Sequence, residues 1–456
     1  MSRIIVTTCL FGLLASSTAC GGQADVIFVG ANVLTGDSSQ PTAEAVALTG
    51  ERIRAVGSST EVRRLAGPKT QIVDLPGRTI IPGLMDAHVH LLVGPLTIVD
   101  ESSLRTYERT ALPRVMSGFI SHGITTVRST ADPLPYITQL RDRLERGEIM
   151  GPRILVTGPT PTSPGGHPAT TVCRNNPFCR QGLAREPSNE EQARRIVREL
   201  ADAKVDAVKV TLENSRGFAN VPLPSDAIVA ALVDEAHRSG LRIIAHIGTD
   251  PDTGFFLTER FGGVGFDEFV HMPDVRTPSE ASRLATVLAG RKMAVTTTVS
   301  IWDAYRDSSG SERLVWGLPY VPGMRKVFDA QLVTTRVFAE AGVRLVVGTD
   351  WVADSDFFRE DDVRLNDPRV QPGARTLYEM DLLRRAGLST TAILAAATRN
   401  AADALGIGDK VGTLAEGKLA DLVILDGDLL RDFSALRRTV AVLKGGRVVH
   451  GMLPER

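Results

Sequence analysis

The chain has 456 residues, a formal net charge of −1 and a pI of about 6.7. This length accommodates one large domain and a smaller accessory domain. The hydrophobic fraction of 43% and the charged fraction of 23% are typical of a globular protein. The sequence contains no long basic run, so it gives no support for binding of nucleic acid, which requires positive charge to displace phosphate counterions.

Residues 1–20 have the pattern of a bacterial export signal. A short positive start leads into the apolar segment 4–15, which is too short to span a bilayer as a stable helix, and small residues follow up to Ala19. Cys20 then resembles the lipidated cysteine of a lipoprotein signal, although Ser17 stands where that signal usually has leucine. We expect an exported, periplasm-facing protein that lipidated Cys20 anchors to the membrane; simple cleavage with release and an uncleaved anchor are the alternatives.

Both ends of the chain contain short β-type runs separated by turn residues. The runs lie at 26–29, 45–48 and 53–56 near the N-terminus and at 421–425, 440–443 and 447–449 near the C-terminus. Such runs at both ends predict one discontinuous β-sandwich accessory domain, formed by residues 24–77 plus 405–451, with a structural role.

Between these ends, strand-like runs alternate with amphipathic helices. A capping box from Ser188 to Glu191 precedes a helix whose apolar face consists of Ala193, Ile196, Val197 and Leu200. Ser225 opens the next helix, which ends before Gly240, and a strand follows at once. This alternation is typical of parallel barrels, so residues 78–404 are predicted to form a (β/α)8 TIM-like barrel in an α/β protein. The predicted strands end near His88, Arg128, Thr157, Lys209, His246, His271, Thr298 and Asp350.

Candidate metal ligands lie at the ends of these strands. His88 and His90 close an apolar run, and residues i and i+2 of a strand point to the same side, so both can reach one ion. A His-x-His pair alone is a weak signal. Further candidates end later strands: Lys209, His246, His271 and Asp350. Parallel barrels carry their active sites at the carboxyl ends of the strands, and histidine and aspartate are residue types that hold divalent zinc.

This order of residues resembles the amidohydrolase superfamily, and within it the imidazolonepropionase-like branch that includes metal-dependent Xaa-Pro dipeptidases and carboxypeptidases. The resemblance also rests on Gly-Leu-Met-Asp-Ala-His at 83–88 and on Gly-Thr-Asp at 348–350. It extends from Ala24 to His450.

The resemblance implies a centre with two divalent ions, expected to be zinc. Family members with a lysine at the position of Lys209 react it with CO2 to give a carbamate that bridges the ions, whereas a free ammonium would be repelled by a cation. The alternative is that Lys209 is an ordinary surface lysine after a strand. Besides the carbamate, the implied ligands are His88, His90 and Asp350 for the first ion and His246 and His271 for the second.

Such a centre implies hydrolysis of an amide, peptide or lactam bond. A hydroxide shared by two metals is a strong nucleophile near neutral pH, and a metal polarises the scissile carbonyl. Asp350 would take the proton as general base and return it to the leaving amine. We therefore expect an exported amidohydrolase for a dipeptide, an N-acyl amino acid or a cyclic amide. The alternatives are a hydrolase or deaminase of a lactone or heterocyclic ring, and a ligand-binding lipoprotein without catalysis.

Three residues are candidates for contact with the substrate. His167 lies in Gly-Gly-His-Pro at 165–168, where dipeptidase-like relatives have Gly-Gly-His-Gly with a histidine that approaches the substrate. Arg128 either pairs with a substrate carboxylate or is a structural barrel residue. Trp351, with the aromatic residues of 302–320, forms either a substrate pocket or a set of loop-packing side chains.

Two departures from the relatives concern the substrate. Many relatives have His-x-Tyr at the fifth strand, with a tyrosine that helps to bind the substrate, whereas His246 is followed by Ile247 and Gly248. The Gly-Gly segment that often follows the lysine is also absent, since Lys209 leads into Val-Thr-Leu-Glu at 210–213. The identity of the substrate therefore does not transfer from the relatives.

Cys173 and Cys179 lie close together in a loop that contains proline and asparagine. In an oxidising compartment such a pair favours a local disulfide over two free thiols. A metal role is not favoured, because two thiolates without nearby histidines provide half a site.

Overall fold

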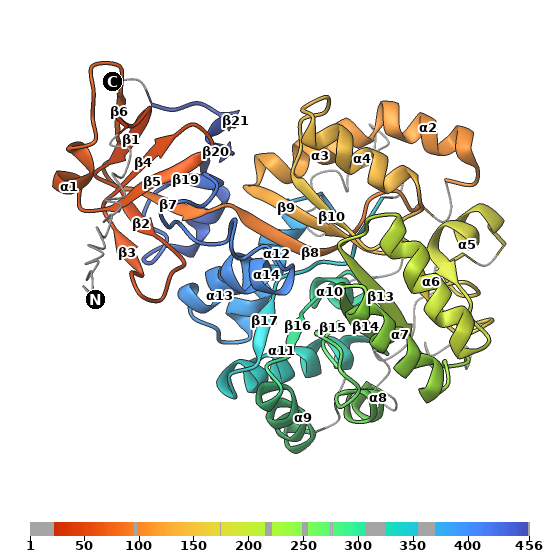
Figure 1. The fold of residues 1–456 in the computed structure, drawn as a ribbon. Coiled ribbons are helices and arrows are strands. Elements are labelled where there is room, and N and C mark those ends of the chain that lie inside the picture. The colour runs from red at the N-terminus through yellow and green to blue at the C-terminus, as the bar shows by residue number, and fades with distance from the viewer. Residues whose placement is uncertain are drawn as a thin grey trace, which may run out of the picture.

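The structure is a computed structural model, and its main features are a β-sandwich beside a larger α/β barrel (Figure 1). It describes residues 22–94, 98–173, 175–214, 221–248, 254–273, 275, 277–306, 324–353 and 370–454. The predicted export signal at 1–20 lies outside the described residues. Among the helices that are described, we find none with the length and apolar character needed to cross a membrane.

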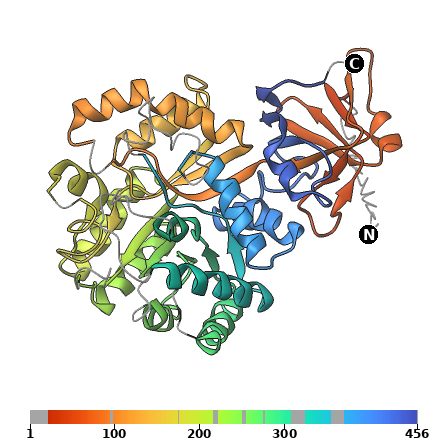
Figure 2. The ribbon, with the colours of Figure 1, turned by 180° about the vertical axis from the view of Figure 1, so that it is seen from behind.

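The sandwich consists of two sheets built from both ends of the chain, as Figure 2 shows from the other side. Within the described residues, the first sheet has the order β5-β4-β1-β6, formed by Arg52–Gly57, Ala45–Thr49, Val26–Val29 and Gln71–Asp74. The second has the order β21-β20-β19-β7-β2-β3, formed by Arg447–Gly451, Thr439–Lys444, Leu422–Asp426, Arg78–Pro82, Asn32–Leu34 and Thr42–Ala43. A helix, α1 (Ser59–Arg63), and a 3-10 turn, η3 (Phe433–Arg437), complete this part.

One hydrophobic cluster joins the two sheets. Phe28 and Val46 of the first sheet pack in it with Ile80, Ile424 and Leu443 of the second, and all five side chains are buried. Strands predicted from the two chain ends are therefore paired and packed together. The predicted boundary differs in one respect: β7 belongs to this sheet, so the sheet reaches into the range that was assigned to the barrel from residue 78 onward.

The barrel is built from parallel strands, which confirms the predicted fold class. In the part of the chain that the structure describes, its strands are β8 (Leu84–His90), β9 (Ile124–Ser129), β10 (Arg153–Val156), β13 (Ala207–Leu212), β14 (Arg242–Ile247), β15 (Glu268–Val270), β16 (Ala294–Thr296) and β17 (Arg344–Val346). The neighbouring pairs from β8 to β10 and from β13 to β17 are parallel. Two backbone hydrogen bonds close the ring, from Asp206 N to Val156 O (2.8 Å) and from Ala87 N to Val347 O (2.9 Å).

Helices follow the strands and cover the outside of the barrel. Their bounds are α2 (Glu101–Thr110), α3 (Leu112–Ser121), α4 (Tyr136–Glu145), α5 (Pro177–Leu183), α6 (Glu190–Asp202), α7 (Asp226–Arg238), α8 (Gly254–Phe261), α9 (Pro278–Gly290), α10 (Ser300–Arg306), α11 (Met324–Glu340), α12 (Ala374–Arg385), α13 (Thr390–Ala397) and α14 (Arg399–Ala404). Three short strands lie in the loops: β11 (Thr160–Pro161), β12 (Ala184–Arg185) and β18 (Trp351–Val352).

The two helices argued from capping residues form as expected. In α6 the buried positions are the four that were predicted, Ala193, Ile196, Val197 and Leu200. Its cap lies one residue later than predicted, because the Asn189 side chain accepts the hydrogen bond from Gln192 N. In α7 the Ser225 side chain accepts from Ile228 N, as its position before the apolar face indicated. Local capping hydrogen bonds thus fix where both helices begin in the sequence.

Candidate metal centre

Six buried side chains from five segments of the barrel lie close together inside it. They are His88, His90, Lys209, His246, His271 and Asp350, and none is more than 7% exposed. The two histidines of β8 share one side of their strand because they are separated by one residue. Every ligand candidate of the sequence is therefore in one place, and none of them is a surface residue.

The first group of ligand atoms surrounds the Asp350 carboxylate. Its Oδ1 lies 3.2 Å from His88 Nε2 and 3.1 Å from His90 Nε2. The Lys209 Nζ is 3.0 Å from His88 Nε2. Ligand atoms of His88, His271 and Asp350 all lie within 4.8 Å of one another. This spacing fits a single divalent cation between nitrogen and oxygen donors.

The second group is a pair of imidazoles. His246 Nδ1 lies 2.9 Å from His271 Nε2, and the ring centroids are 4.4 Å apart. The other ring nitrogen of His271 is 2.7 Å from Thr298 Oγ1. Two nitrogens on a tetrahedral zinc with bonds of about 2.0–2.1 Å would be separated by about 3.3 Å, so this pair needs little adjustment to hold one ion.

Lys209 lies inside the barrel wall and is 4% exposed, which rules out the surface reading. The strand does not end there as predicted, since β13 continues to Leu212. Burial, and then the adjacent positive charge of Lys209, hold the pKa of His88 well below its usual range. His88 is therefore a neutral imidazole, the form that binds a metal ion. A charged amine among these ligands would oppose a cation, so the residue fits the centre only when its charge is removed.

Asp350 is ionised in this setting. Burial alone would raise its pKa, but hydrogen bonds from His88 and His90 outweigh burial and hold the pKa well below the usual range. The backbone at Asp350 is in the left-handed region with φ of 54°, and His271 with φ of 75° and Thr298 with φ of 49° share this property. Each such residue costs about 1–3 kcal/mol and persists where surrounding structure enforces it, often at functional sites.

Asp86 is a supporting residue that the sequence did not reveal. Its Oδ1 accepts from His88 N (3.2 Å) and Thr349 N (3.1 Å), and its Oδ2 accepts from Thr349 Oγ1 and Thr376 Oγ1, both at 2.8 Å. Burial raises the pKa of Asp86 to about 6. Gly348 leaves the space that this loop requires, because a Cβ at residue 348 would lie 2.4 Å from Thr296 Cγ2. These bonds hold the loop of Asp350 against β8.

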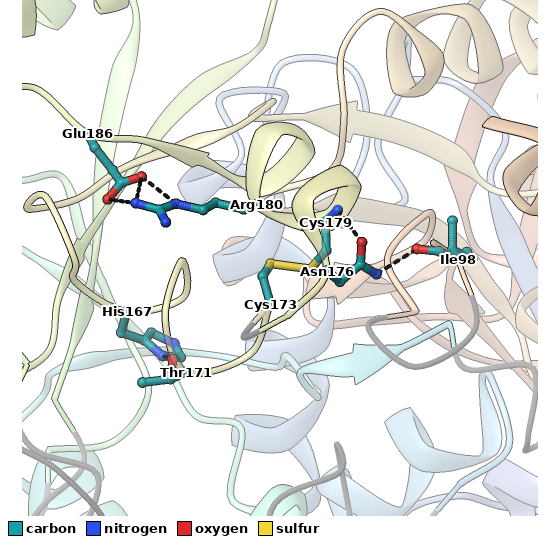
Figure 3. Close-up of a disulfide and its surroundings, with 8 residues drawn as sticks. All are labelled: Ile98, His167, Thr171, Cys173, Asn176, Cys179, Arg180 and Glu186. Carbon is teal, nitrogen blue, oxygen red and sulfur yellow. Dashed lines mark hydrogen bonds and ion pairs between the residues drawn. A yellow bond between two sulfur atoms is a disulfide. The ribbon is translucent and has the colours of Figure 1, made fainter. Parts of the chain in front are cut away.

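His167 reaches the site from the loop after β10, as predicted. Its ring lies beside that of His246, with centroids 5.1 Å apart and the ring planes tilted by 36°. Its Nδ1 is 2.5 Å from Thr171 Oγ1 (Figure 3). The predicted disulfide between Cys173 and Cys179 is present in the same loop. Asn176 Nδ2 donates to Ile98 O at 3.0 Å and fastens this loop to the neighbouring segment.

The contacts of Arg128 favour the structural role, which is the second of the two alternatives that the sequence left open. The side chain is 2% exposed and donates to Glu268 through two bonds, Nη1 to Oε2 at 2.8 Å and Nη2 to Oε1 at 2.5 Å. Its Nε donates to Ala87 O at 2.8 Å. All of these donors are engaged inside the barrel wall, so Arg128 links β8, β9 and β15. They are not available for a bidentate hydrogen bond to a substrate carboxylate.

This assignment predicts a loss of stability in Arg128→Ala. The change leaves the Glu268 charge buried without its partner, so we expect the free energy of unfolding to fall by about 3–5 kcal/mol. Denaturant unfolding followed by circular dichroism measures it. The double variant Arg128→Met with Glu268→Leu serves as the control, since it removes both charges and should recover much of the loss. An unchanged free energy of unfolding together with a raised KM would instead show that Arg128 binds the substrate.

Trp351 is also structural. It is 1% exposed, its Nε1 donates to Val370 O at 2.8 Å, and its ring meets Phe119 of α3 edge to face with centroids 5.7 Å apart. Of the other aromatic candidates, Trp302 is buried on α10, while Trp316 and Tyr320 lie outside the described residues. For Trp351 the loop-packing alternative therefore holds.

A pocket is lined by four of the six candidate metal ligands. It has an empty volume of about 520 Å³, including solvent at its mouth. Its floor is formed by His90, Lys209, His246 and Asp350, and its described walls by Val93, Ala131, Thr160, His167, Pro168, Val172, Leu183, Thr211 and Ile301. The walls are mainly apolar, and the polar groups are concentrated at the floor, as is typical of a site for a small molecule.

A (β/α)8 barrel with this buried set of imidazoles, lysine and carboxylate at its strand ends is a metal-dependent hydrolase. The chain belongs to the Amidohydrolase family, whose model matches residues 79–449. Imidazolonepropionase of Symbiobacterium thermophilum is 27% identical over 421 residues, which cover 84% of this chain and 83% of that protein. N-substituted formamide deformylase of Arthrobacter pascens is 45% identical over 69 residues, which cover 15% of this chain and 13% of that protein.

Solved structures share the fold. A Xaa-Pro dipeptidase with bound methionine in its active site has a TM-score of 0.72 at 21% identity, covering 93% of this chain and 99% of that one. Ochratoxinase of A. niger has a TM-score of 0.74 at 20% identity, covering 94% and 96%. The family and its relatives identify a hydrolase that acts on carbon–nitrogen bonds.

Proposed function

We propose that this protein is an exported hydrolase with two divalent ions, expected to be zinc, that cleaves a small amide or peptide. The observation that carries the proposal is the burial of all six ligand candidates in one cluster, of which His90, Lys209, His246 and Asp350 form the floor of the pocket. Carboxylated Lys209 would bridge the ions, because its Nζ lies beside His88 Nε2 and its free charge does not suit the site. His88, His90 and Asp350 would hold one ion, and His246 and His271 the other.

The chemistry that two such ions supply when bound is activation of water and polarisation of the scissile carbonyl. Asp350 carries the proton: its ionised carboxylate takes it from the attacking water and returns it to the leaving nitrogen. His167 stands on the other side of the pocket, where its ring faces His246. From there it can donate a hydrogen bond to the substrate carbonyl as negative charge develops.

The substrate proposed is a dipeptide, an N-acyl amino acid or a cyclic amide with an apolar side chain. Apolar walls formed by Val93, Val172, Leu183 and Ile301 support this choice. The names of similar proteins point to the same bond type, since they include a Xaa-Pro dipeptidase, an N-substituted formamide deformylase and phenylurea hydrolase B. Imidazolonepropionase relatives favour a cyclic amide as a second candidate.

The test is hydrolysis of a panel by protein loaded with zinc. The panel contains dipeptides, N-acyl amino acids, cyclic amides and lactones, each with apolar and charged side chains. We expect turnover of an apolar amide that stops on chelation of the metal and returns on its replacement. Turnover of lactones alone would show that the bond cleaved is an ester and not an amide. Binding of panel members without turnover would indicate a protein that captures a ligand.

Export is proposed from residues 1–20, with lipidated Cys20 as the anchor. Cys20→Ser should release the protein from the membrane fraction and leave specific activity unchanged, because none of the proposed ligand or substrate residues belongs to the segment 1–20. Fractionation of cells that express either form measures this. A wild-type protein found wholly in the soluble periplasmic fraction would contradict lipidation.

A further inference from the structure

Glu213 is a buried carboxylate beside the proposed metal centre that the proposed reaction does not use. It directly follows β13 and lies on the same side of the chain as Lys209 and Thr211, the alternate residues of that strand. Its side chain is 0% exposed, and its Oε2 lies 3.4 Å from His246 Nε2. Burial of a carboxylate away from water is costly, so a hydrogen bond from a ring N–H would help to stabilise the Glu213 side chain.

The contact between Glu213 and Nε2 of His246 affects the state of the other ring nitrogen, Nδ1. A neutral imidazole carries its hydrogen on one nitrogen and offers a lone pair at the other. When Nε2 donates to Glu213, Nδ1 presents its lone pair, and this atom is the one that lies 2.9 Å from His271 Nε2. When His271 Nδ1 likewise donates to Thr298 Oγ1, 2.7 Å away, His271 Nε2 presents its lone pair as well. The two lone pairs are then available to one ion.

Gly248 provides the room for this carboxylate. A Cβ at residue 248 would lie 2.9 Å from Glu213 Oε1 and 3.0 Å from Leu257 Cδ1, so a larger residue would displace the Glu213 side chain or Leu257. The two departures noted in the sequence, glutamate at 213 and glycine at 248, thus lie next to one another in the structure.

We propose that Glu213 is a positioning residue for the metal ligand His246. It accepts a hydrogen bond from Nε2, fixes the ring with Nδ1 toward the ion shared with His271, and raises the affinity for that ion. Gly248 permits this by leaving the carboxylate its space. The inference rests on the proposed two-metal centre, but it concerns metal binding and is measured without substrate.

The experiment compares metal binding by the full chain and by three variants, Glu213→Ala, Glu213→Gln and Gly248→Ala. Each metal-free protein is titrated with Zn²⁺ against a chelating dye, and each Co²⁺-loaded protein is examined by visible absorption. Glu213→Ala should weaken one of two bound ions by about 10–100-fold, the effect typical of such outer partners, and change the cobalt spectrum. Glu213→Gln should recover much of the affinity, because its carboxamide oxygen still accepts from Nε2. Gly248→Ala should weaken the same ion.

Glu259→Gln is the matched control, since this carboxylate forms an ion pair with Arg283 on the surface. It should bind both ions as the wild type does. The proposal is overturned if Glu213→Ala retains wild-type affinity and an unchanged cobalt spectrum. It is also overturned if the alanine and glutamine variants lose both ions equally while their metal-free forms melt early, because that pattern indicates a role in packing alone. Absence of amide turnover would count against the proposed function only.

Discussion

Replacement of Lys209 by alanine will remove metal and abolish turnover together. The proposed carbamate is the one protein ligand proposed to be common to both ions, so its loss should reduce bound metal from about two ions per chain to one or fewer, most strongly at the pair His246 and His271. Turnover of a substrate found in the panel should fall to the level of the uncatalysed reaction. Metal content by mass spectrometry, measured beside kcat, tests this expectation.

A chemical control accompanies Lys209→Ala. Added acetate or propionate should restore part of the metal and activity, because a free carboxylate can stand where the carbamate stood. Lys410→Ala, at an exposed lysine of the loop before β19, should leave metal and turnover unchanged. A Lys209→Ala protein with full metal and near-normal turnover would show that the lysine is not a ligand, and the centre would then hold one ion.

Asp350→Asn should separate proton transfer from metal binding. The amide preserves the size of the side chain and one oxygen ligand, but it cannot take up the proton. We expect kcat to fall by a factor on the order of 10² to 10⁴, which is what general acid–base catalysis typically contributes, while most of the metal remains. The measurement is kcat and metal content for the same preparation.

The comparison between the two variants is itself a test. Lys209→Ala should lose metal and activity in proportion, whereas Asp350→Asn should lose activity at nearly constant metal. Loss of the metal from Asp350→Asn in proportion to kcat would show that the residue acts as a ligand alone. A kcat within a factor of about two of the wild type would remove Asp350 from the proton path altogether.

Much of the fold could be predicted because its signals are local. The caps of α6 and α7, the apolar faces that follow them and the turn residues between β-type runs are all read within a few neighbouring positions. The pairing of Cys173 with Cys179 is also local, since the chain between them is short. In each case the interacting groups are close in the sequence, so no knowledge of the tertiary structure is required.

The roles that the sequence left open depend on partners far away in the chain. Arg128 was open to two readings because its partner Glu268 is 140 residues later. Trp351 was offered as a substrate contact, although Phe119 and Val370 enclose it. Asp86 went unnoticed for the same reason, since its bonds reach Thr349 and Thr376.

The sequence by itself determined which side chains meet at the candidate metal centre. It could do so because these six residues lie within or shortly after parallel strands, toward the carboxyl ends, and the carboxyl ends of such strands meet at one end of a barrel. The six are His88, His90, Lys209, His246, His271 and Asp350. Only the tertiary structure decided how the remaining buried charges are used. Formation of the barrel brings Arg128 to Glu268, and the parallel pairing of β13 with β14 brings Glu213 to His246. A buried charge is stabilised by the partner that folding places beside it.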